Sequence, residues 1–509
     1  MGDSCTAVYL PESKPACHTP YMRRSPEPSG SFRPFRFRRA VAIAVGVPLA
    51  LAIIVPLARR SFRGESNVSL VKLTGHAAEV AAVAPPPPTL AGLDLAKIDV
   101  KDQGVTAPLP DKRVAKLAID PALQRAAESV MTSYHLPEAS VVLMDVETGR
   151  ILVYASHLEK GPKRDLAVEA TAPAASVFKV VTGASLVEHT NVSPDDKHCY
   201  SGGEQRILLQ DLTPDPKRDR WCTTLGGAMG RSINTVFARL ALAHLKPAQL
   251  EETAKSLGFG APLPFDVPVQ PSSAKFPEDP LGFARTAAGF WNTTLSPIHA
   301  TWLGAAIARG GEPVRPVLAT DIVDDGKVVW RAPTGLAQKR VMKADTARAL
   351  TTMMETTVTD GTSYRAFHDA KGRSFLPGVS VAGKTGTLTD AASQRYYTWF
   401  SGFAPSRPVA ISSDSHKDGH DAAQPRKVAF AALVANDPKW TIKANVLARE
   451  VLRAYFAGQH VPGVTSPHPA DSAAPKNQKA RGDGLPSREG GPPAISTTPG
   501  TKQRRQRGS

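Results

Sequence analysis

The chain has 509 residues and a formal net charge of +16, a length that would allow two to four domains. Much of the positive charge lies at the two ends, where residues 1–40 carry seven Lys or Arg against three acidic residues and residues 461–509 carry eight against three. Both ends lack the apolar pattern needed to offset their ordering entropy. The charge therefore does not require a nucleic acid partner, and none is predicted. The basic ends are expected to stay solvated or to contact anionic lipids or polymers.

An uncharged run of 19 residues, from Ala40 to Ala58, predicts one N-terminal transmembrane helix. Residues 1–39 form a basic segment that we expect to be disordered and cytoplasmic, because positive charge favours the cytoplasmic side. Three arginines between residues 59 and 63 oppose this orientation. A cleaved signal peptide is the alternative, although the apolar run is long for one and no clear cleavage site follows it.

The rest of the chain divides into a tether, one large folded domain and a tail. Residues 59–112 are expected to form a Pro-rich tether, stiffened by the four prolines at 85–88. Residues 113–457 are long enough for one large catalytic domain with its own core. Residues 458–509 are expected to form a disordered basic tail.

The folded region is expected to begin with a helix, because Asp120 and Pro121 are typical of an N-cap and a first helical turn. A hairpin follows from Ala139 to Ala155, with its turn at residues 147–149. Apolar helices come next, and strands and one more helix end the domain. We expect the later helices at 300–309, 344–357 and 441–455 and the later strands at 379–387, 396–403 and 427–436. This order predicts an α+β fold in which an antiparallel sheet packs against a helical cluster.

Two of the four cysteines, Cys199 and Cys222, follow the predicted anchor and would lie in an exported compartment, where disulfides persist. A bond between them would close a polar loop that has no core of its own, and would stabilise it by about 3 kcal/mol. Cys5 and Cys17 precede the anchor and are expected to stay reduced. No metal site is predicted, because two cysteines without a C-x-x-C pattern do not suffice for zinc.

Ser176 and Lys179 lie three residues apart in an apolar stretch that predicts a central helix. One helical turn brings the two side chains together, and burial lowers the pKa of a lysine. A neutral Lys179 would accept the proton of Ser176 and make it a nucleophile for acyl transfer. The alternative, a helix N-cap with a surface lysine, is favoured for the same spacing at Ser69–Lys72 in the tether and at Ser272–Lys275 in a Pro-rich loop.

Two further patterns follow along the chain. Ser232 and Asn234 lie two residues apart at a predicted loop-to-helix junction, where both side chains can point into one cleft. An ordinary serine N-cap is the alternative there. The run Lys384-Thr385-Gly386-Thr387 predicts a strand with an exposed edge, on which Gly386 would let a substrate backbone come close.

In this order, the motifs Ser176-x-x-Lys179, Ser232-x-Asn234 and Lys384-Thr385-Gly386-Thr387 resemble those of the transpeptidase domain of penicillin-binding proteins, which are related to the serine β-lactamases. The resemblance covers about residues 113–457 and implies the fold of that family. It implies that Ser176 is the acyl-accepting nucleophile and Lys179 its base. It also implies that Ser232 relays a proton to the leaving amine, and that Asn234 holds Lys179 and the substrate amide.

The resemblance assigns roles to the third motif as well. Lys384 and Thr385 would bind the substrate carboxylate, and the backbone N–H groups of Ser176 and Thr387 would form the oxyanion hole. The segment 288–293 departs from a Gly-Gln-Gly-like stretch that is frequent in the family, which affects the expected shape of the cleft.

The implied activity is that of a D,D-transpeptidase that crosslinks D-Ala-D-Ala stem peptides of bacterial peptidoglycan and binds β-lactams covalently, with no cofactor. Other proteins of cell-wall synthesis are its expected partners. The predicted anchor would place the catalytic domain on the periplasmic side of the bacterial inner membrane, as a single-pass protein. The region before Ile119 looks too short for the family's usual pedestal domain or for a glycosyltransferase domain, which predicts a monofunctional member.

Three alternatives remain open. Water in place of an amine at the second step would make the protein a D,D-carboxypeptidase. A class A β-lactamase would need an E-x-x-N loop between Asn234 and Lys384, where none occurs, and class D enzymes typically have Ser-x-Val as the second motif. A non-catalytic β-lactam sensor would need a cytoplasmic effector that the first 40 residues do not supply, whereas a division scaffold would be compatible with the same sequence.

Overall fold

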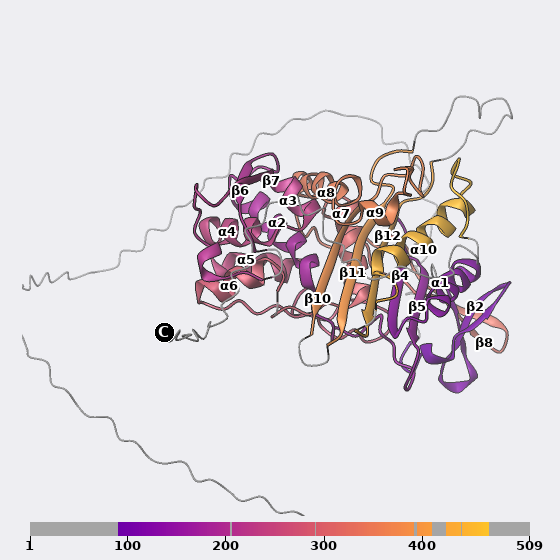
Figure 1. Cartoon of the computed structure of the whole chain (residues 1–509). Helices are drawn as coiled ribbons and strands as arrows, with labels where there is room; N and C mark the ends of the chain where they lie inside the picture. The colour runs from indigo at the N-terminus through magenta and orange to yellow at the C-terminus, as the bar shows by residue number, and fades with distance from the viewer. Residues whose placement is uncertain are drawn as a thin grey trace, which may run out of the picture. The chain divides into compact units, whose positions relative to one another are not determined.

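The computed structural model describes residues 90–203, 206–290, 292–390, 394–409, 424–438 and 440–467 (Figure 1). The predicted transmembrane helix, the segment before it, the predicted tether as far as residue 89 and the basic tail beyond residue 467 lie outside these ranges. Among the residues that are described, no helix is both long enough and apolar enough to cross a membrane.

A five-stranded antiparallel sheet forms the centre of the fold, with the strand order β10-β11-β12-β4-β5. Its strands are β4 (Glu138–Asp145), β5 (Ile151–Leu158), β10 (Ala382–Thr389), β11 (Tyr396–Ala404) and β12 (Val428–Asn436). Every residue of β12 is buried, because this nearly uncharged strand lies in the middle of a sheet that is covered on both faces. The predicted hairpin and the three later strands are therefore confirmed.

Two helices, α1 (Pro121–Ser133) and α10 (Ala444–Gly458), cover one face of this sheet. Helix α1 begins where the sequence predicted. The Oδ1 atom of Asp120 accepts hydrogen bonds from the backbone N–H groups of Ala122 at 2.8 Å and Leu123 at 3.0 Å. These bonds satisfy two of the N–H groups that the first turn of a helix leaves without a partner.

The helical cluster covers the other face. Its members are α2 (Lys179–His189), α3 (Leu225–Arg231), α4 (Asn234–His244), α5 (Pro247–Ser256), α6 (Pro280–Ala287), α7 (Pro297–Ala308) and α8 (Ala344–Thr359). The short α9 (Tyr364–Phe367) packs instead with α10 on the first face, where Phe367 contacts Phe400. Helix α7 is apolar nearly all round and packs directly on β11 and β12. The predicted α+β arrangement of an antiparallel sheet on a helical cluster is confirmed.

A second five-stranded sheet lies in the order β1-β2-β3-β8-β9. Its strands are β1 (Asp99–Lys101), β2 (Gly104–Pro108), β3 (Val114–Leu117), β8 (Ala319–Asp324) and β9 (Lys327–Arg331), preceded by the short 3-10 helix η1 (Leu95–Lys97). The prediction of a tether as far as residue 112 was therefore wrong for its last part. These strands are three to six residues long, and β3 pairs with β8 about 200 residues later, so local pattern alone does not reveal them.

A small hairpin and three short 3-10 helices complete the description. A two-stranded hairpin pairs β6 (Lys197–Tyr200) with β7 (Trp221–Thr224) next to α3 and α4. The 3-10 helices η2 (Pro110–Lys112), η3 (Ala175–Phe178) and η4 (Leu209–Asp211) are each a single turn. Of these, η3 carries the first residue of the predicted active site and leads directly into α2.

The contact between α7 and β11 depends on a glycine, which makes it a sensitive test of the fold. A Cβ atom at Gly304 would lie 2.4 Å from the carbonyl oxygen of Gly402, a distance that forces the helix away from the sheet. We expect Gly304→Ala to lower the free energy of unfolding by about 1–3 kcal/mol, measured by urea denaturation. Gly458→Ala at the end of α10 is the matched control, because a Cβ there meets nothing within 4 Å. A Gly304→Ala protein as stable as this control would contradict the packing.

Candidate active site

Ser176 lies in η3, one turn before the buried residue Lys179 that begins α2. The Nζ atom of Lys179 is 2.8 Å from the Oγ atom of Ser176, as the three-residue spacing predicted. Ala175 has a φ of +49°, in the left-handed region that costs an L-residue of this kind roughly 1 kcal/mol. This turn directs the chain so that Ser176 stays half-buried at the surface while Val177 and Phe178 enter the core.

The side chain of Lys179 is completely buried and is surrounded by neutral acceptors. Its Nζ atom donates to Oδ1 of Asn234 at 2.6 Å and to the backbone carbonyl of Ala288 at 2.5 Å. Among the described residues, no carboxylate forms an ion pair with this lysine. Burial therefore lowers the pKa of Lys179 well below its usual value, and the nearby charge of Lys384 lowers it further. A lysine in this environment can act as a base near neutral pH.

The second motif lies where α3 ends and α4 begins. Ser232 follows the last residue of α3 with φ +59° and ψ +41°, and Asn234 is the first residue of α4. The left-handed turn at Ser232 directs its hydroxyl toward the sheet, where Oγ lies 2.9 Å from Nζ of Lys384. The Nδ2 atom of Asn234 donates to the carbonyl of Gly203 at 3.2 Å. The two side chains thus contact different lysines of the same site.

The third motif lies on β10, an edge strand of the central sheet. Lys384 is completely buried, and its Nζ atom also donates to the carbonyl of Thr385 at 2.9 Å. Burial lowers the pKa of Lys384 to about 7. The Oγ1 atom of Thr385 lies 2.6 Å from Oγ1 of Thr362, and Thr387 is exposed on the same strand.

Gly386 has a packing role that the sequence did not predict. A Cβ atom at this position would lie 3.2 Å from Cβ of Ala175 and 3.3 Å from the carbonyl oxygen of Ala174. The absence of a side chain therefore lets η3 pack against β10, which places Ser176 beside the third motif. Gly289, with a φ of +80°, approaches η3 in the same way, because a Cβ there would lie 2.3 Å from the carbonyl of Ala175.

The structure thus brings all three motifs together from segments that lie far apart in the chain. It adds three groups that the sequence did not point to, namely the carbonyl of Ala288, the carbonyl of Gly203 and the hydroxyl of Thr362. Two of these are backbone carbonyls, which every residue has, so no residue type marks them. Within the described ranges, no group of three or more His, Cys, Asp or Glu residues is arranged to hold a metal ion.

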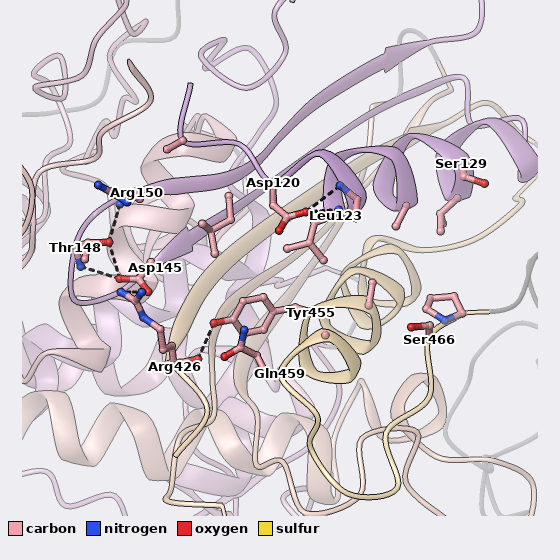
Figure 2. Close-up of a pocket in the computed structure, with 18 residues that line it drawn as sticks. Asp120, Leu123, Ser129, Asp145, Thr148, Arg150, Arg426, Tyr455, Gln459 and Ser466 are labelled. Carbon is pink, nitrogen blue, oxygen red and sulfur yellow. Dashed lines mark hydrogen bonds and ion pairs between the residues drawn. The ribbon is translucent and has the colours of Figure 1, made fainter. Parts of the chain in front are cut away.

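A pocket on the opposite face of the sheet holds none of the predicted site residues (Figure 2). It lies between α1, α10 and the turn that joins β4 to β5. Several of its polar groups are paired with one another. Asp145 accepts from Thr148 and forms an ion pair with Arg426 at 2.7 Å, and the hydroxyl of Tyr455 donates to the carbonyl of Arg426 at 3.1 Å. These contacts link the sheet to α10 and do not resemble a reaction centre.

Cys199 and Cys222 form a disulfide that joins β6 to β7, with their Cα atoms 3.9 Å apart. The loop between them lies against α4, the helix that begins with Asn234. The bond predicted from the sequence is therefore part of the structure on the side of the site that holds the second motif.

Comparison with known proteins identifies a family model and several relatives that this chain resembles. A family model described as "Penicillin binding protein transpeptidase domain" matches residues 139–435, more than half of the chain. Peptidoglycan D,D-transpeptidase PbpA of Mycobacterium tuberculosis H37Rv is 26% identical over 356 residues, which cover 62% of this chain and 66% of that protein. Stage V sporulation protein D of Bacillus subtilis is 25% identical over 314 residues, covering 57% of this chain and 47% of that protein. The chain thus spans between about half and just under two thirds of these relatives.

Solved structures agree on the fold. The crystal structure of PBPA from M. tuberculosis superposes with a TM-score of 0.53 at 21% identity, and the match covers 67% of this chain and 82% of that one. The same protein as a penicillin G acyl-enzyme complex gives a TM-score of 0.50 at 22% identity, covering 68% of this chain and 80% of that one.

The burial of two lysines predicts how stability depends on pH. An unfolded lysine has a pKa near 10.4, whereas the folded pKa of Lys384 is about 7. Between these values the unfolded state binds more protons, so the free energy of unfolding rises with pH. We expect Lys384 to contribute on the order of 2 kcal/mol of this rise between pH 7 and pH 9, and Lys179 to act in the same direction.

Urea denaturation at pH 7 and pH 9 measures this rise. Lys384→Met should reduce it, because methionine keeps the buried volume but binds no proton. Lys327→Met, at an exposed position in β9, is the matched control and should leave the rise unchanged. Equal rises in the two variants would argue against a neutral Lys384.

Proposed function

Because this chain belongs to the transpeptidase family of penicillin-binding proteins, we propose that it is a serine D,D-transpeptidase that crosslinks peptidoglycan stem peptides. The observation that carries the proposal is the contact between Ser176 and the buried Lys179, whose Nζ and Oγ atoms lie 2.8 Å apart. A hydroxyl beside a lysine that burial holds neutral is an activated nucleophile.

The first step forms an acyl-enzyme. Lys179 accepts the proton of Ser176, and Oγ attacks the carbonyl carbon of the penultimate D-Ala of the stem peptide. The backbone N–H groups of Ser176 and Thr387 would stabilise the oxyanion, and losing one such donor typically costs 10²–10³ in rate. When the C–N bond breaks, the terminal D-Ala would leave as an amine, and Ser232 would relay to it the proton that Lys179 took from Ser176.

The third motif is suited to hold the free carboxylate of that terminal D-Ala. At rest, burial lowers the pKa of Lys384 to about 7. An arriving carboxylate favours the charged form of the lysine and raises this pKa, so binding and protonation support each other. Thr385, next to it on β10, would donate its hydroxyl to the same carboxylate.

The second step decides between the two leading activities. Attack on the acyl-enzyme by an amine from a neighbouring stem peptide makes a crosslink, whereas attack by water makes a D,D-carboxypeptidase. A β-lactamase needs a base that activates water quickly. In the described part of the chain, no carboxylate contacts Ser176 or Lys179 by hydrogen bond or ion pair, which favours a long-lived penicillin adduct.

We also propose that the protein is a monofunctional, single-pass protein of the bacterial cytoplasmic membrane with its catalytic domain on the outer side. The uncharged run Ala40–Ala58 supports an anchor, and the disulfide between Cys199 and Cys222 is compatible with an oxidising compartment. Peptidoglycan stem peptides and β-lactams are the proposed ligands, and other cell-wall synthesis proteins the proposed partners.

Labelling with a fluorescent penicillin tests the nucleophile. We expect one covalent adduct per chain, mapped to Ser176 by peptide mass spectrometry, and no adduct in Ser176→Ala. Ser272 supplies the matched control, because Ser272 and Lys275 share the Ser-x-x-Lys spacing and Ser272 is buried. Ser272→Ala should label like the wild type. A retained adduct in Ser176→Ala would overturn the assignment.

The base is tested in the same assay. Lys179→Met should lower the acylation rate by at least 10²-fold, within the range for loss of a general base, whereas Lys275→Met should not. An adduct on Ser176 that turns over within seconds in the wild type would instead indicate a β-lactamase.

Product analysis separates the two leading activities. With a pentapeptide stem ending in D-Ala-D-Ala and a D-amino acid acceptor, a transpeptidase gives the exchanged peptide, detected by mass. A carboxypeptidase gives only the tetrapeptide. Tetrapeptide alone at high acceptor concentration would favour the carboxypeptidase.

A further inference from the structure

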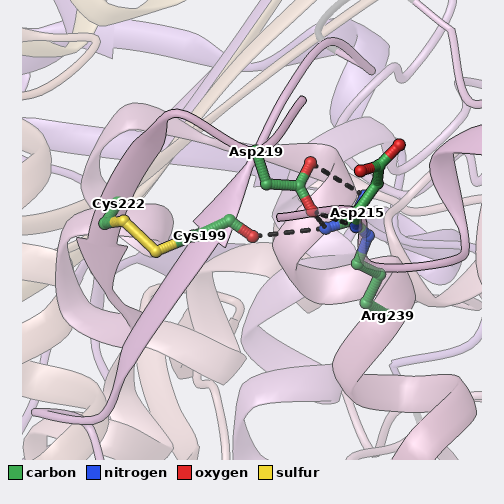
Figure 3. Close-up of a disulfide and its surroundings, with 5 residues drawn as sticks. All are labelled: Cys199, Asp215, Asp219, Cys222 and Arg239. Atoms are coloured by element: carbon green, nitrogen blue, oxygen red, sulfur yellow. Dashed lines mark hydrogen bonds and ion pairs between the residues drawn. A yellow bond between two sulfur atoms is a disulfide. The ribbon is translucent and has the colours of Figure 1, made fainter. Parts of the chain in front are cut away.

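The disulfide closes a polar segment that reaches the active site. This segment, here named the disulfide segment, comprises residues 199–203 and 206–222. It lies against α4 and is held there by polar contacts around Arg239 (Figure 3). Because α4 begins at Asn234, the segment touches the residue that holds the proposed base.

The side-chain amide of Asn234 has an acceptor oxygen and a donor nitrogen, and both atoms form hydrogen bonds. Its Oδ1 atom lies 2.6 Å from Nζ of Lys179, and its Nδ2 atom donates to the carbonyl of Gly203 at 3.2 Å. A carbonyl can only accept a hydrogen bond, so it pairs with the Nδ2 end and turns Oδ1 toward the lysine. The Gly203 carbonyl therefore favours the orientation in which the Oδ1 atom of Asn234 faces Lys179.

Close packing holds that carbonyl in place. The Oγ1 atom of Thr235 donates to the neighbouring carbonyl of Gly202 at 2.8 Å. Gly203 has a φ of +76°, and a Cβ atom there would lie 1.8 Å from Oγ1 of Thr235. Only a glycine lets the chain pass so close to the start of α4.

Arg239 fixes the rest of the segment to the same helix. Its guanidinium donates to the carbonyl of Asp211 at 2.7 Å, to the carbonyls of Cys199 and Thr213 at 3.2 Å each, and forms an ion pair with Asp219 at 2.6 Å. The two side chains of the ion pair are only 10% and 4% exposed. Asp219 also accepts from the hydroxyl of Ser201 at 2.9 Å, two residues before Gly203. The ion pair thus connects both ends of the segment to α4.

We propose that the disulfide segment is a positioning element for the reaction: it sets the orientation of the Asn234 amide and thereby the place of Lys179 beside Ser176. Asp219 and Arg239 are positioning residues, and the bond between Cys199 and Cys222 keeps the two ends of the segment together. The inference rests on the proposed function, because its readout is the acylation of Ser176. A displacement of about 1 Å at a catalytic group can cost roughly 10²-fold in rate.

The test compares oxidised and reduced full-length protein in detergent. The disulfide is reduced with a phosphine, the thiols are alkylated with iodoacetamide, and the reagents are removed. The acylation rate constant at saturating fluorescent penicillin, the half-saturating concentration and the final number of adducts per chain are then measured. We expect the rate constant to fall by about tenfold or more, while the number of adducts stays near one.

The separation of rate from adduct number distinguishes positioning from folding. If the segment only supports folding, reduction will lower the number of adducts per chain and leave the rate constant of the remaining molecules unchanged. That result would overturn the inference. An unchanged rate constant and adduct number after complete reduction would overturn it as well. The variant Cys199→Ser/Cys222→Ser receives the same treatment. It should acylate slowly from the start and should not respond to the reductant.

Asp219→Asn is an independent test that leaves the disulfide intact. Its matched control is Asp266→Asn, because Asp266 is also buried, pairs with Arg315 at 2.7 Å and accepts backbone N–H groups at the start of β8, in the second sheet. Asp219→Asn should lower the acylation rate constant about tenfold, whereas Asp266→Asn should lower stability only. Equal acylation rate constants in Asp219→Asn and Asp266→Asn would overturn the inference. Absence of any adduct in the oxidised wild type would instead refute the proposed function.

Discussion

The site depends on keeping two lysine amines out of water although, among the residues that the structure describes, no carboxylate pairs with either. Lys179 and Lys384 are both completely buried, and a lone ammonium group in such a place is costly unless it loses its proton. Neutral acceptors surround both amines, namely an amide oxygen, two backbone carbonyls and two hydroxyls. A carboxylate in the same place would hold the proton on the lysine and remove the base.

This constraint explains why backbone segments approach one another so closely here. Burial of both amines requires that η3, β10 and the end of α6 pack closely. Gly386 and Gly289 make this possible, because a Cβ on either would press on Ala174 or Ala175. The same compactness places Ser176 beside the strand on which the substrate is proposed to lie, so the packing that lowers the lysine pKa values also assembles the reacting groups.

Much of this arrangement could be predicted from the sequence, and the features that could not be predicted were missed for physical reasons. The helix start at Asp120 and the central strands carry local signals, and the three motifs mark their own residue types. The second sheet was missed because its strands are short and pair across 200 residues. The carbonyls of Ala288 and Gly203 were missed because only the folded chain brings them to Lys179 and Asn234. The role of Arg239 was missed for the same reason, because folding brings it to Asp211 and Asp219.

The two lysines also influence each other, and this coupling suits a two-part substrate. With a pKa of about 7, Lys384 is charged in part of the empty sites near neutral pH, and in these its charge lowers the pKa of Lys179 and keeps the base free of its proton. A substrate carboxylate that pairs with Lys384 neutralises that charge, so the pKa of Lys179 rises again and the amine becomes a stronger base. Because Ser176 lies 2.8 Å away, the gain in basicity acts on its hydroxyl. Recognition of the terminal carboxylate would therefore strengthen the base only when a peptide is in place.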